Sequence, residues 1–63
     1  MENLTLIRMP EVQRLCGGVS RPTVYRWQRR YGFPRGGHLG EKTKVWNKAD
    51  VLQWITKRMK EAA

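Results

Sequence analysis

The spacing of apolar residues along the chain predicts a short strand followed by a short helix. Residues 4–7 form a brief apolar run around Thr5 that can pair as a strand. Pro10 suits the first turn of a helix, because its missing N–H leaves no intrahelical hydrogen bond unmade there. Val12 and Leu15 give this helix an apolar edge, and Gly17-Gly18 end it soon afterwards.

A second helix is predicted at residues 20–31. Ser20 is a suitable N-cap, Pro22 fits the first turn, and Gly32 with Pro34 marks the end of the helix. At about 100° per residue, one side of the helix gathers a largely apolar set, Val24, Trp27, Gln28 and Tyr31. The opposite side carries a basic stripe of Arg26 and Arg29, flanked by Thr23, Tyr25 and Arg30.

Residues 35–46 predict a small β-hairpin. Strand-favouring residues occur at 35–39 and 44–46, and the chain is expected to turn at residues 40–43. Asn47 then caps a last helix, with Asp50 in its first turn, where a negative charge suits the helix dipole. The apolar side of this helix comprises Val51, Leu52, Trp54, Ile55 and Met59. The predicted fold is mostly α with a small hairpin, in a winged helix-turn-helix layout.

The large aromatic side chains are expected inside this fold. A chain of 63 residues buries only about 60% of the surface that it exposes when unfolded, so its core needs its bulkiest residues. We therefore assign Trp27, Tyr31, Trp46 and Trp54 to the core. Cys16 is interpreted as a small buried residue at the end of the first helix.

Charge adds a functional indication to the pattern. The chain carries 13 Lys and Arg against 5 Asp and Glu, a net charge of +8. Residues 21–44 hold seven basic residues and one acid, Glu41. Like charges at close helical spacing cost a few tenths of a kcal/mol per pair, on the order of what an ion pair gains there. The alternatives are a solvated helix face and a polyanionic ligand that offsets the charge, and the segregation favours the ligand.

Composition excludes several other classes of protein. Residues 1–63 are expected to form one domain; no apolar run approaches the roughly 20 residues of a membrane span, and the start does not resemble a signal peptide. One cysteine allows no intramolecular disulfide and suits the cytoplasm. A single histidine and scattered acids do not favour a metal site, and the chain shows neither a phosphate-binding glycine loop nor a nucleophile–base pair. We predict no enzyme activity, no cofactor and no small-molecule substrate.

Four sequence blocks occur in one order along the chain: LIRMPEV at residues 6–12, SRPTVYRW at 20–27, GFP at 32–34 and WNKADVLQW at 46–54. With these blocks, from about residue 6 to residue 58, the chain resembles the AlpA family. These are small phage- and prophage-encoded DNA-binding regulators, related in fold to MerR-type winged helices and to phage excisionases. The resemblance implies a regulator of prophage genes, a factor for prophage excision, or both.

Pattern, charge and resemblance together predict an interface for double-stranded DNA. The second helix (20–31) is expected in the major groove and the hairpin (35–46) on flanking backbone. The candidate DNA-binding residues are Arg21, Thr23, Tyr25, Arg26, Arg29 and Arg30 on the helix and Arg35, His38, Lys42 and Lys44 on the hairpin. Arginine can pair bidentately with guanine, so Arg26 and Arg29 are candidates for base contacts, and Arg30 for a backbone contact. Thr23 has local capping as its alternative role, and Tyr25 has packing over the first helix.

Two other functions share parts of this pattern. A small basic RNA-binding module has the same charge, but single-strand recognition favours exposed aromatic residues, and here only Tyr25 lies off the core sides. A protein-binding adaptor or a membrane-surface peptide is the third class, and the glycine interruptions argue against the long helix of a membrane peptide. Trp54 and Met59 suggest self-association on DNA. Integrase and RNA polymerase are candidate protein partners, and the bacterial nucleoid is the expected location.

Overall fold

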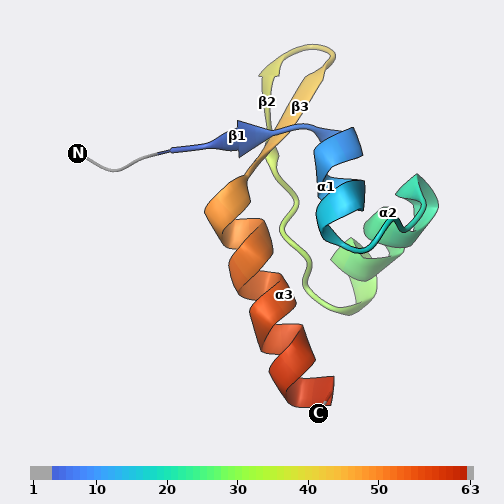
Figure 1. The fold of residues 1–63 in the computed structure, drawn as a ribbon. Coiled ribbons are helices and arrows are strands. Elements are labelled where there is room, and N and C mark those ends of the chain that lie inside the picture. Colours follow the sequence, from blue (N-terminus) through green and yellow to red (C-terminus); the bar gives the residue numbers. More distant parts are fainter. Residues whose placement is uncertain (1–3, 63) are drawn as a thin grey trace.

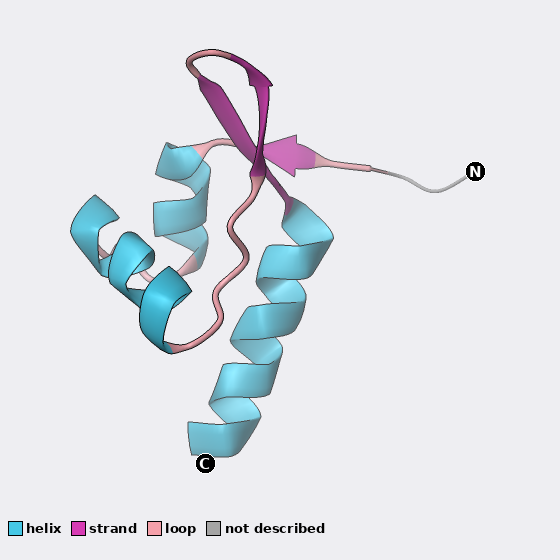
Figure 2. Ribbon diagram, turned by 180° about the vertical axis from the view of Figure 1, so that it is seen from behind, coloured by secondary structure: helices cyan, strands magenta, loops and turns pink. Residues whose placement is uncertain are grey.

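The computed structural model describes residues 4–62, which form helices around a small antiparallel sheet (Figure 1). The elements follow one another as β1 (Leu6–Ile7), α1 (Met9–Leu15), α2 (Arg21–Arg30), β2 (Gly37–Gly40), β3 (Thr43–Asn47) and α3 (Lys48–Ala62). This order confirms the predicted fold class, mostly α with a β-hairpin wing beside a helix-turn-helix. The hairpin projects past the helices at one end of the molecule, and the end of α3 points away from it (Figure 2).

The central strand of the sheet is β3, which has antiparallel neighbours on both edges in the order β1-β3-β2. β1 pairs with the end of β3, where Ile7 lies opposite Trp46. β2 pairs with its beginning, where His38 lies opposite Lys44. The predicted hairpin is therefore present, but its turn is limited to residues 41–42 and its first strand begins at residue 37 rather than 35. The predicted brief strand forms as β1 and adds a third strand.

Gly36 explains why β2 begins later than expected. Its φ is +73°, in the left-handed region that favours glycine. A Cβ atom at this position would lie 2.4 Å from the carbonyl oxygen of Val45 and 3.1 Å from the indole ring of Trp46. The chain thus needs glycine to bend closely past Trp46 before the strand can start.

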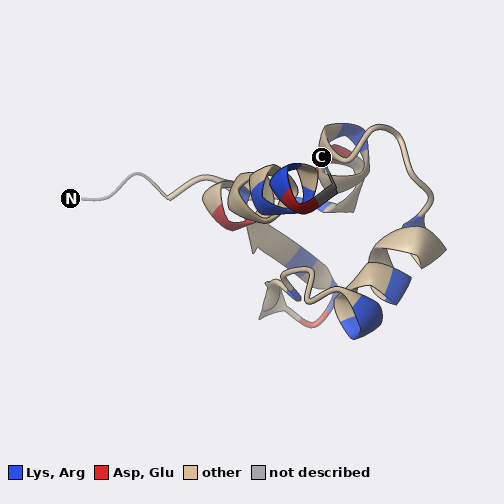
Figure 3. Cartoon of the chain, turned by 90° about the horizontal axis from the view of Figure 1, so that it is seen from below, with Lys and Arg blue, Asp and Glu red and all other residues tan. Residues whose placement is uncertain are grey.

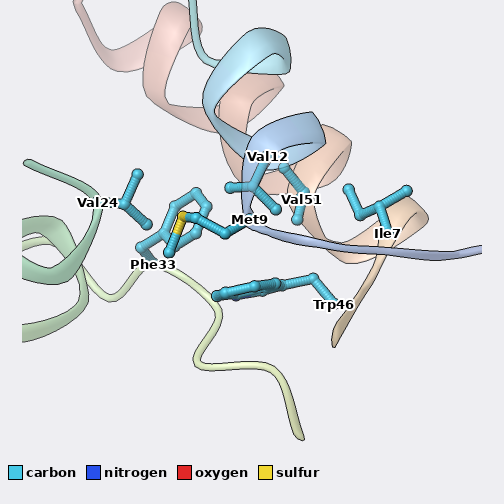
Figure 4. Close-up of a cluster of buried hydrophobic side chains, with 7 residues drawn as sticks. All are labelled: Ile7, Met9, Val12, Val24, Phe33, Trp46 and Val51. Carbon is cyan, nitrogen blue, oxygen red and sulfur yellow. The ribbon is translucent and has the colours of Figure 1, made fainter. Parts of the chain in front are cut away.

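The core is a cluster of side chains from β1, β3, all three helices and the loop after α2: Ile7, Met9, Val12, Val24, Phe33, Trp46 and Val51 (Figure 4). Trp46 is 1% exposed, as predicted, and its Nε1–H donates a hydrogen bond of 2.8 Å to the carbonyl of Pro34. Its one polar atom is therefore satisfied inside the core.

A second aromatic cluster joins α2 to α3 at the edge of this core. The ring of Phe33 meets that of Trp54 edge-on at 4.8 Å, and Trp54 lies 5.5 Å from Trp27. The Nε1–H of Trp54 donates to the carbonyl of Tyr31 at 3.0 Å. Trp27 and Trp54 are half-buried, so they pack against the core without being enclosed by it.

The helix ends follow the predicted local signals in most places. Asn47 accepts a hydrogen bond from the backbone N–H of Ala49 at 3.0 Å, which confirms it as the cap of α3. At the end of α2, Gly32 has a φ of +71° and the N–H of Phe33 donates back to the carbonyl of Trp27 at 3.2 Å. Ser20 occupies the N-cap of α2, although its side chain makes no capping bond to the backbone.

Several residues assigned to the apolar interior lie partly outside it. Tyr31 is 46% exposed, so its assignment to the core was wrong. It occupies the C-cap of α2, and its ring packs under the guanidinium of Arg58 at 4.3 Å rather than inside the core. Leu52 (42%) and Met59 (68%), predicted on the apolar side of the last helix, are also exposed, and Met59 lies in the last turns of the 15-residue α3. Cys16 is half-buried rather than enclosed.

Candidate nucleic-acid interface

The outer side of α2 carries arginines that are all exposed to solvent: Arg21, Arg26, Arg29 and Arg30. On the inner side Val24 is completely buried, with 0% exposure. The predicted orientation of this helix, apolar side inward and basic side outward, is therefore confirmed. Helical spacing places Arg26 and Arg29 along the middle of the outer side and aligns Arg21 with Tyr25, four residues later.

A groove runs between the start of α1, the first half of α2 and the hairpin. Its volume is about 470 Å³, and we call it the basic groove after its four cationic residues, Arg8, Arg21, Lys42 and Lys44. Tyr25 and Trp46 form its aromatic wall. Seen along the molecule from below, Lys and Arg recur on α2 and on the hairpin beside it (Figure 3). Arg21 belongs both to α2 and to the basic groove, so it connects the basic side of α2 with the wing.

Lys44 holds a fixed position in this groove. Its Nζ lies 5.1 Å from the ring centroid of Tyr25 and 5.2 Å from that of Trp46, within cation–π range of both. The side chain is half-buried as a result. Tyr25 itself packs against the core cluster, to which Met9 and Val12 of the first helix belong. Its ring therefore supports Lys44 at the junction of α2 and β3.

Thr23 also has a partner within the protein. Its hydroxyl oxygen lies 2.9 Å from the hydroxyl oxygen of Ser20, at hydrogen-bond distance. The side chain is half-buried, unlike those of the four arginines of α2. The local role that the sequence offered for Thr23 therefore has a structural basis, although it involves the Ser20 side chain rather than a free backbone N–H.

The hairpin residues divide between the basic groove and its surroundings. Lys42, in the turn, and Lys44, on β3, line the groove. His38 is exposed and lies opposite Lys44 in the strand pair, so both side chains project from the same face of the sheet. Arg35 is exposed on the segment before β2 and does not line the groove.

Within residues 4–62, the cations of this surface have no ion-pair partner. The ion pairs within residues 4–62 join Arg14 to Glu11 and Arg58 to Glu61, and neither includes a predicted DNA-binding residue. Hydrogen bonding to Arg14 lowers the pKa of the Glu11 carboxyl, so this acid is engaged on its own helix. The exposed positive charge of α2 and the hairpin is therefore available to an anion.

Arg8 belongs to this surface, and the sequence reasoning missed it. The residue lies outside the helical periodicity from which the second helix was analysed, between β1 and α1. Only the pairing of β1 with β3 brings it beside the hairpin, and such pairing is non-local. The available signal was its position between two apolar residues, Ile7 and Met9, which indicates an outward-facing side chain.

This arrangement is chemically suited to a long polyanion. Exposed guanidinium groups on a projecting helix can donate hydrogen bonds to base edges, and the ammonium and guanidinium groups of the basic groove can neutralise phosphates beside it. No helix within residues 4–62 combines the length and hydropathy needed to cross a membrane.

Comparisons with known proteins agree with this geometry. The AlpA protein of Escherichia coli K12, described as a DNA-binding transcriptional activator, is 33% identical over 61 residues, which cover 87% of this chain and 86% of that protein. The uncharacterized protein ORF88 of Enterobacteria phage P4 is 40% identical over 53 residues, 84% of this chain. The matched part spans only 59% of ORF88. No solved structure matches the chain.

A protein-family model also matches most of the chain. The model described as prophage CP4-57 regulatory protein (AlpA) matches residues 5–59, which extend from just before β1 into the last turns of α3. Since the match includes the helix pair, the hairpin and most of α3, the chain belongs to the AlpA family of prophage regulatory proteins.

Proposed function

We propose that this protein binds double-stranded DNA sequence-specifically, with α2 in the major groove and the hairpin on the flanking backbone. The observation that carries the proposal is that Arg21, one of the four exposed arginines of α2, also lines the basic groove at the wing. A helix in the major groove meets base edges, and a neighbouring wing meets the phosphates beside it.

The proposal gives the cationic residues different roles. Arg26 and Arg29, on the middle of the outer side, contact base edges, because bidentate pairing with guanine suits exposed guanidinium groups. Arg30 contacts the sugar-phosphate backbone. Arg21, Lys42 and Lys44 neutralise phosphates at the basic groove. Arg35 and His38 lie farther along the backbone that passes the hairpin, and Tyr25 and Thr23 act mainly by supporting their neighbours.

Control of prophage genes and promotion of prophage excision are both compatible with such an interface. A small basic domain can bend DNA or hold a second protein, an RNA polymerase or an integrase, beside its site. The position of the bound DNA distinguishes the two functions. A footprint over a promoter indicates transcriptional control, and a footprint over an attachment site indicates excision. Either function places the protein on bacterial DNA in the cytoplasm.

The principal experiment measures binding to a specific and a random duplex at several salt concentrations. If roughly five to seven phosphates are neutralised, log K falls with log salt with a slope of about −5 to −6. Affinity for the specific duplex must also exceed that for the random one. A flat salt response, or equal affinity for both duplexes, would contradict the proposal.

A structured RNA serves as the competitor in the same experiment, because RNA binding is the alternative function. The aromatic side chains do not favour it: Trp46 is buried, Trp27 and Trp54 pack against one another, and Tyr25 lies under Lys44. Tyr31 is 46% exposed, but Arg58 packs on its ring at 4.3 Å. Stacking of unpaired bases requires free aromatic faces. We therefore expect duplex DNA to compete better than RNA at equal phosphate concentration.

Self-association on DNA forms a further part of the proposal. An apolar groove of about 410 Å³ lies between the ends of α1, α2 and α3, where Leu15, Trp27, Ile55 and Met59 are among the lining residues. We call it the α1–α3 groove. A second copy is its proposed occupant. The charge of +8 opposes contact between free copies, whereas DNA neutralises that charge and holds copies close together.

This part is tested with Met59, which is 68% exposed and contributes little to the core. Met59→Gln should abolish cooperative binding to a duplex with two adjacent sites, while leaving affinity for a single site unchanged. The parent protein provides the comparison in both titrations. Unchanged cooperativity in the variant would exclude the α1–α3 groove as the contact between copies.

A further inference from the structure

The basic groove concentrates positive charge from four separate parts of the chain. Arg8 precedes α1, Arg21 begins α2, Lys42 lies in the hairpin turn and Lys44 lies on β3. Among residues 4–62, no acid lines the groove. Repulsion among converging cations is unfavourable unless an anion binds between them, and such a cluster therefore indicates an anion site.

The four acids that the structure describes do not supply the missing negative charge. Within the described part of the chain, Glu11 pairs with Arg14 and Glu61 with Arg58. Asp50 lies in the first turn of α3, on the rim of another pocket, and Glu41 is exposed in the hairpin turn. None of these four acids is paired with a cation of the basic groove, so the cations are available to a ligand that carries negative charge.

Arg8 is held so that its side chain faces outward. The residues on either side of it, Ile7 and Met9, are each only 8% exposed and belong to the core cluster. The carbonyl of Arg8 accepts hydrogen bonds of 3.0 Å from the N–H groups of Glu11 and Val12. Its backbone is therefore fixed between β1 and α1, and its exposed guanidinium projects from a rigid base.

Lys44 is fixed on the other side of the groove by the two aromatic rings described above. A cation held in place loses little conformational freedom when an anion binds, so the site is preorganised. Arg8 and Lys44 belong to β-structure and its immediate continuation, whereas Arg21 belongs to α2. An anion between them would link the recognition helix to the sheet.

We propose that the basic groove binds the phosphodiester backbone of DNA and that Arg8, outside both α2 and the hairpin, donates one of its phosphate contacts. The inference rests on the proposed DNA-binding function and extends it. Its occupant is the strand that leaves the major groove near the start of α2. Arg8 acts on affinity and register and does not discriminate between sequences, because a phosphate contact is the same for every base pair.

The first test compares Arg8→Ala with Lys57→Ala in the full chain. Lys57 is exposed on α3 and lines a different pocket, so its loss removes the same formal charge away from the basic groove. Arg8→Ala should weaken binding to the specific and the random duplex by the same factor and flatten the salt slope by about 0.9. Lys57→Ala should leave the slope unchanged.

The outcomes separate the inference from the function on which it rests. A flat salt slope in the parent protein contradicts the proposed function itself. A steep parent slope with equal slopes for Arg8→Ala and Lys57→Ala leaves DNA binding intact and overturns the role of Arg8. Thermal melting checks that each variant is folded, and Arg8→Gln, which keeps the aliphatic stem, replaces Arg8→Ala if the alanine variant is unfolded.

A second test locates the phosphate directly. Individual phosphates of the specific duplex are replaced by uncharged methylphosphonates, and each duplex is titrated with the parent and with Arg8→Ala. At the contacted phosphate, the replacement should weaken DNA binding by the parent protein. It should have little further effect on binding by Arg8→Ala, since both changes remove the same interaction. Equal losses in the two proteins at every phosphate would overturn the assignment.

Discussion

α2 and α3 are both amphipathic and both carry arginine, but the fold uses their charges differently. On α2, Arg26 and Arg29 are exposed, and neither ion pair within residues 4–62 involves them. On α3, Arg58 is half-buried, lies 4.3 Å from the centroid of the Tyr31 ring and approaches the carboxylate of Glu61 at 4.0 Å. The contacts of an arginine within the protein, rather than its charge alone, therefore distinguish a candidate interface from a structural role.

The apolar sides of the two helices differ in how much of each is buried. The apolar side of α2 is covered, with Val24 at 0% exposure and Trp27 packed on Trp54. The apolar side of α3 is covered only in part, since Val51 is buried whereas Met59 is 68% exposed. α2 thus presents surplus charge and α3 surplus apolar surface. A polyanion suits the first surface, and a protein suits the second.

The largest expected effect concerns Phe33, which connects the two helices. Its ring lies 4.8 Å from Trp54 of α3 and 6.4 Å from Trp27 of α2, and it is 2% exposed. Phe33→Ala should lower the free energy of unfolding by about 3–5 kcal/mol, because it removes a large buried side chain and leaves a cavity. For so small a domain this loss approaches the whole stability.

Urea denaturation followed by tryptophan fluorescence measures this effect. Met59→Ala on the exposed end of α3 is the control and should change stability by no more than about 0.5 kcal/mol. If the two variants were equally stable, α2 and α3 would not share the core through Phe33, and the comparison between them would lose its structural basis.

The second prediction compares the loss of an exposed arginine of α2 with the loss of a packed arginine of α3. Arg26→Ala should cost about 1–3 kcal/mol of binding free energy on the specific duplex and relax the base preference, as expected for loss of a base contact. Arg58→Ala removes the same charge but should leave base preference unchanged, since Arg58 packs on Tyr31. Both are measured by titrating duplexes mutated at single positions. Unaltered base preference in Arg26→Ala would show that the assigned orientation of α2 on DNA is wrong.

The sequence was sufficient for the features of α2 and α3 that depend on local signals. Pro22, Gly32 and Asn47 act on the backbone within a few residues of their own positions, so the ends of the helices could be anticipated. The outward direction of Arg26 follows from the helical period alone. The element order and fold class were predictable for the same reason.

Features that depend on contacts between distant segments could not be predicted in this way. Tyr31 packs against Arg58, 27 positions later in the chain, rather than in the core. Arg8 reaches the basic groove because β1 pairs with β3, and β2 starts late because Gly36 passes Trp46. Each of these contacts joins residues whose separation leaves no periodic signal in the sequence.

The third prediction concerns Lys44, which packs within the protein and is also a candidate contact for DNA. Lys44 packs on Tyr25 and Trp46 and also lines the basic groove. Lys44→Ala should weaken binding to all DNA sequences by the same factor and flatten the salt slope by about one unit. It should also lower the free energy of unfolding by about 0.5–1 kcal/mol through loss of the aromatic contacts.

Lys60→Ala is the matched control, since Lys60 is exposed near the end of α3. It should alter neither the salt slope nor the unfolding free energy. A sequence-dependent loss in Lys44→Ala would assign this lysine to base recognition instead of the backbone.

The smallest expected effect is on the alkylation rate of Cys16, which reports on the apolar surface of α3 without a substitution. Cys16 lines the α1–α3 groove, and partial burial raises the pKa of its thiol. The thiolate is the reactive form, so at pH 8 Cys16 should be alkylated by iodoacetamide more slowly than an exposed cysteine, whose pKa is about 8.5. The rate should continue to rise with pH above that ordinary value. Unfolding in urea should remove the difference.

Addition of DNA extends this measurement to the proposed contact between copies. A duplex with two adjacent sites should slow the alkylation of Cys16 further, because a second copy covers the α1–α3 groove. A duplex with one site should not, since none of the residues that line the α1–α3 groove lines the basic groove or is an arginine of α2. Equal rates on the two duplexes would mean that the surplus apolar surface of α3 does not join neighbouring copies. The charged surface of α2 would then act alone.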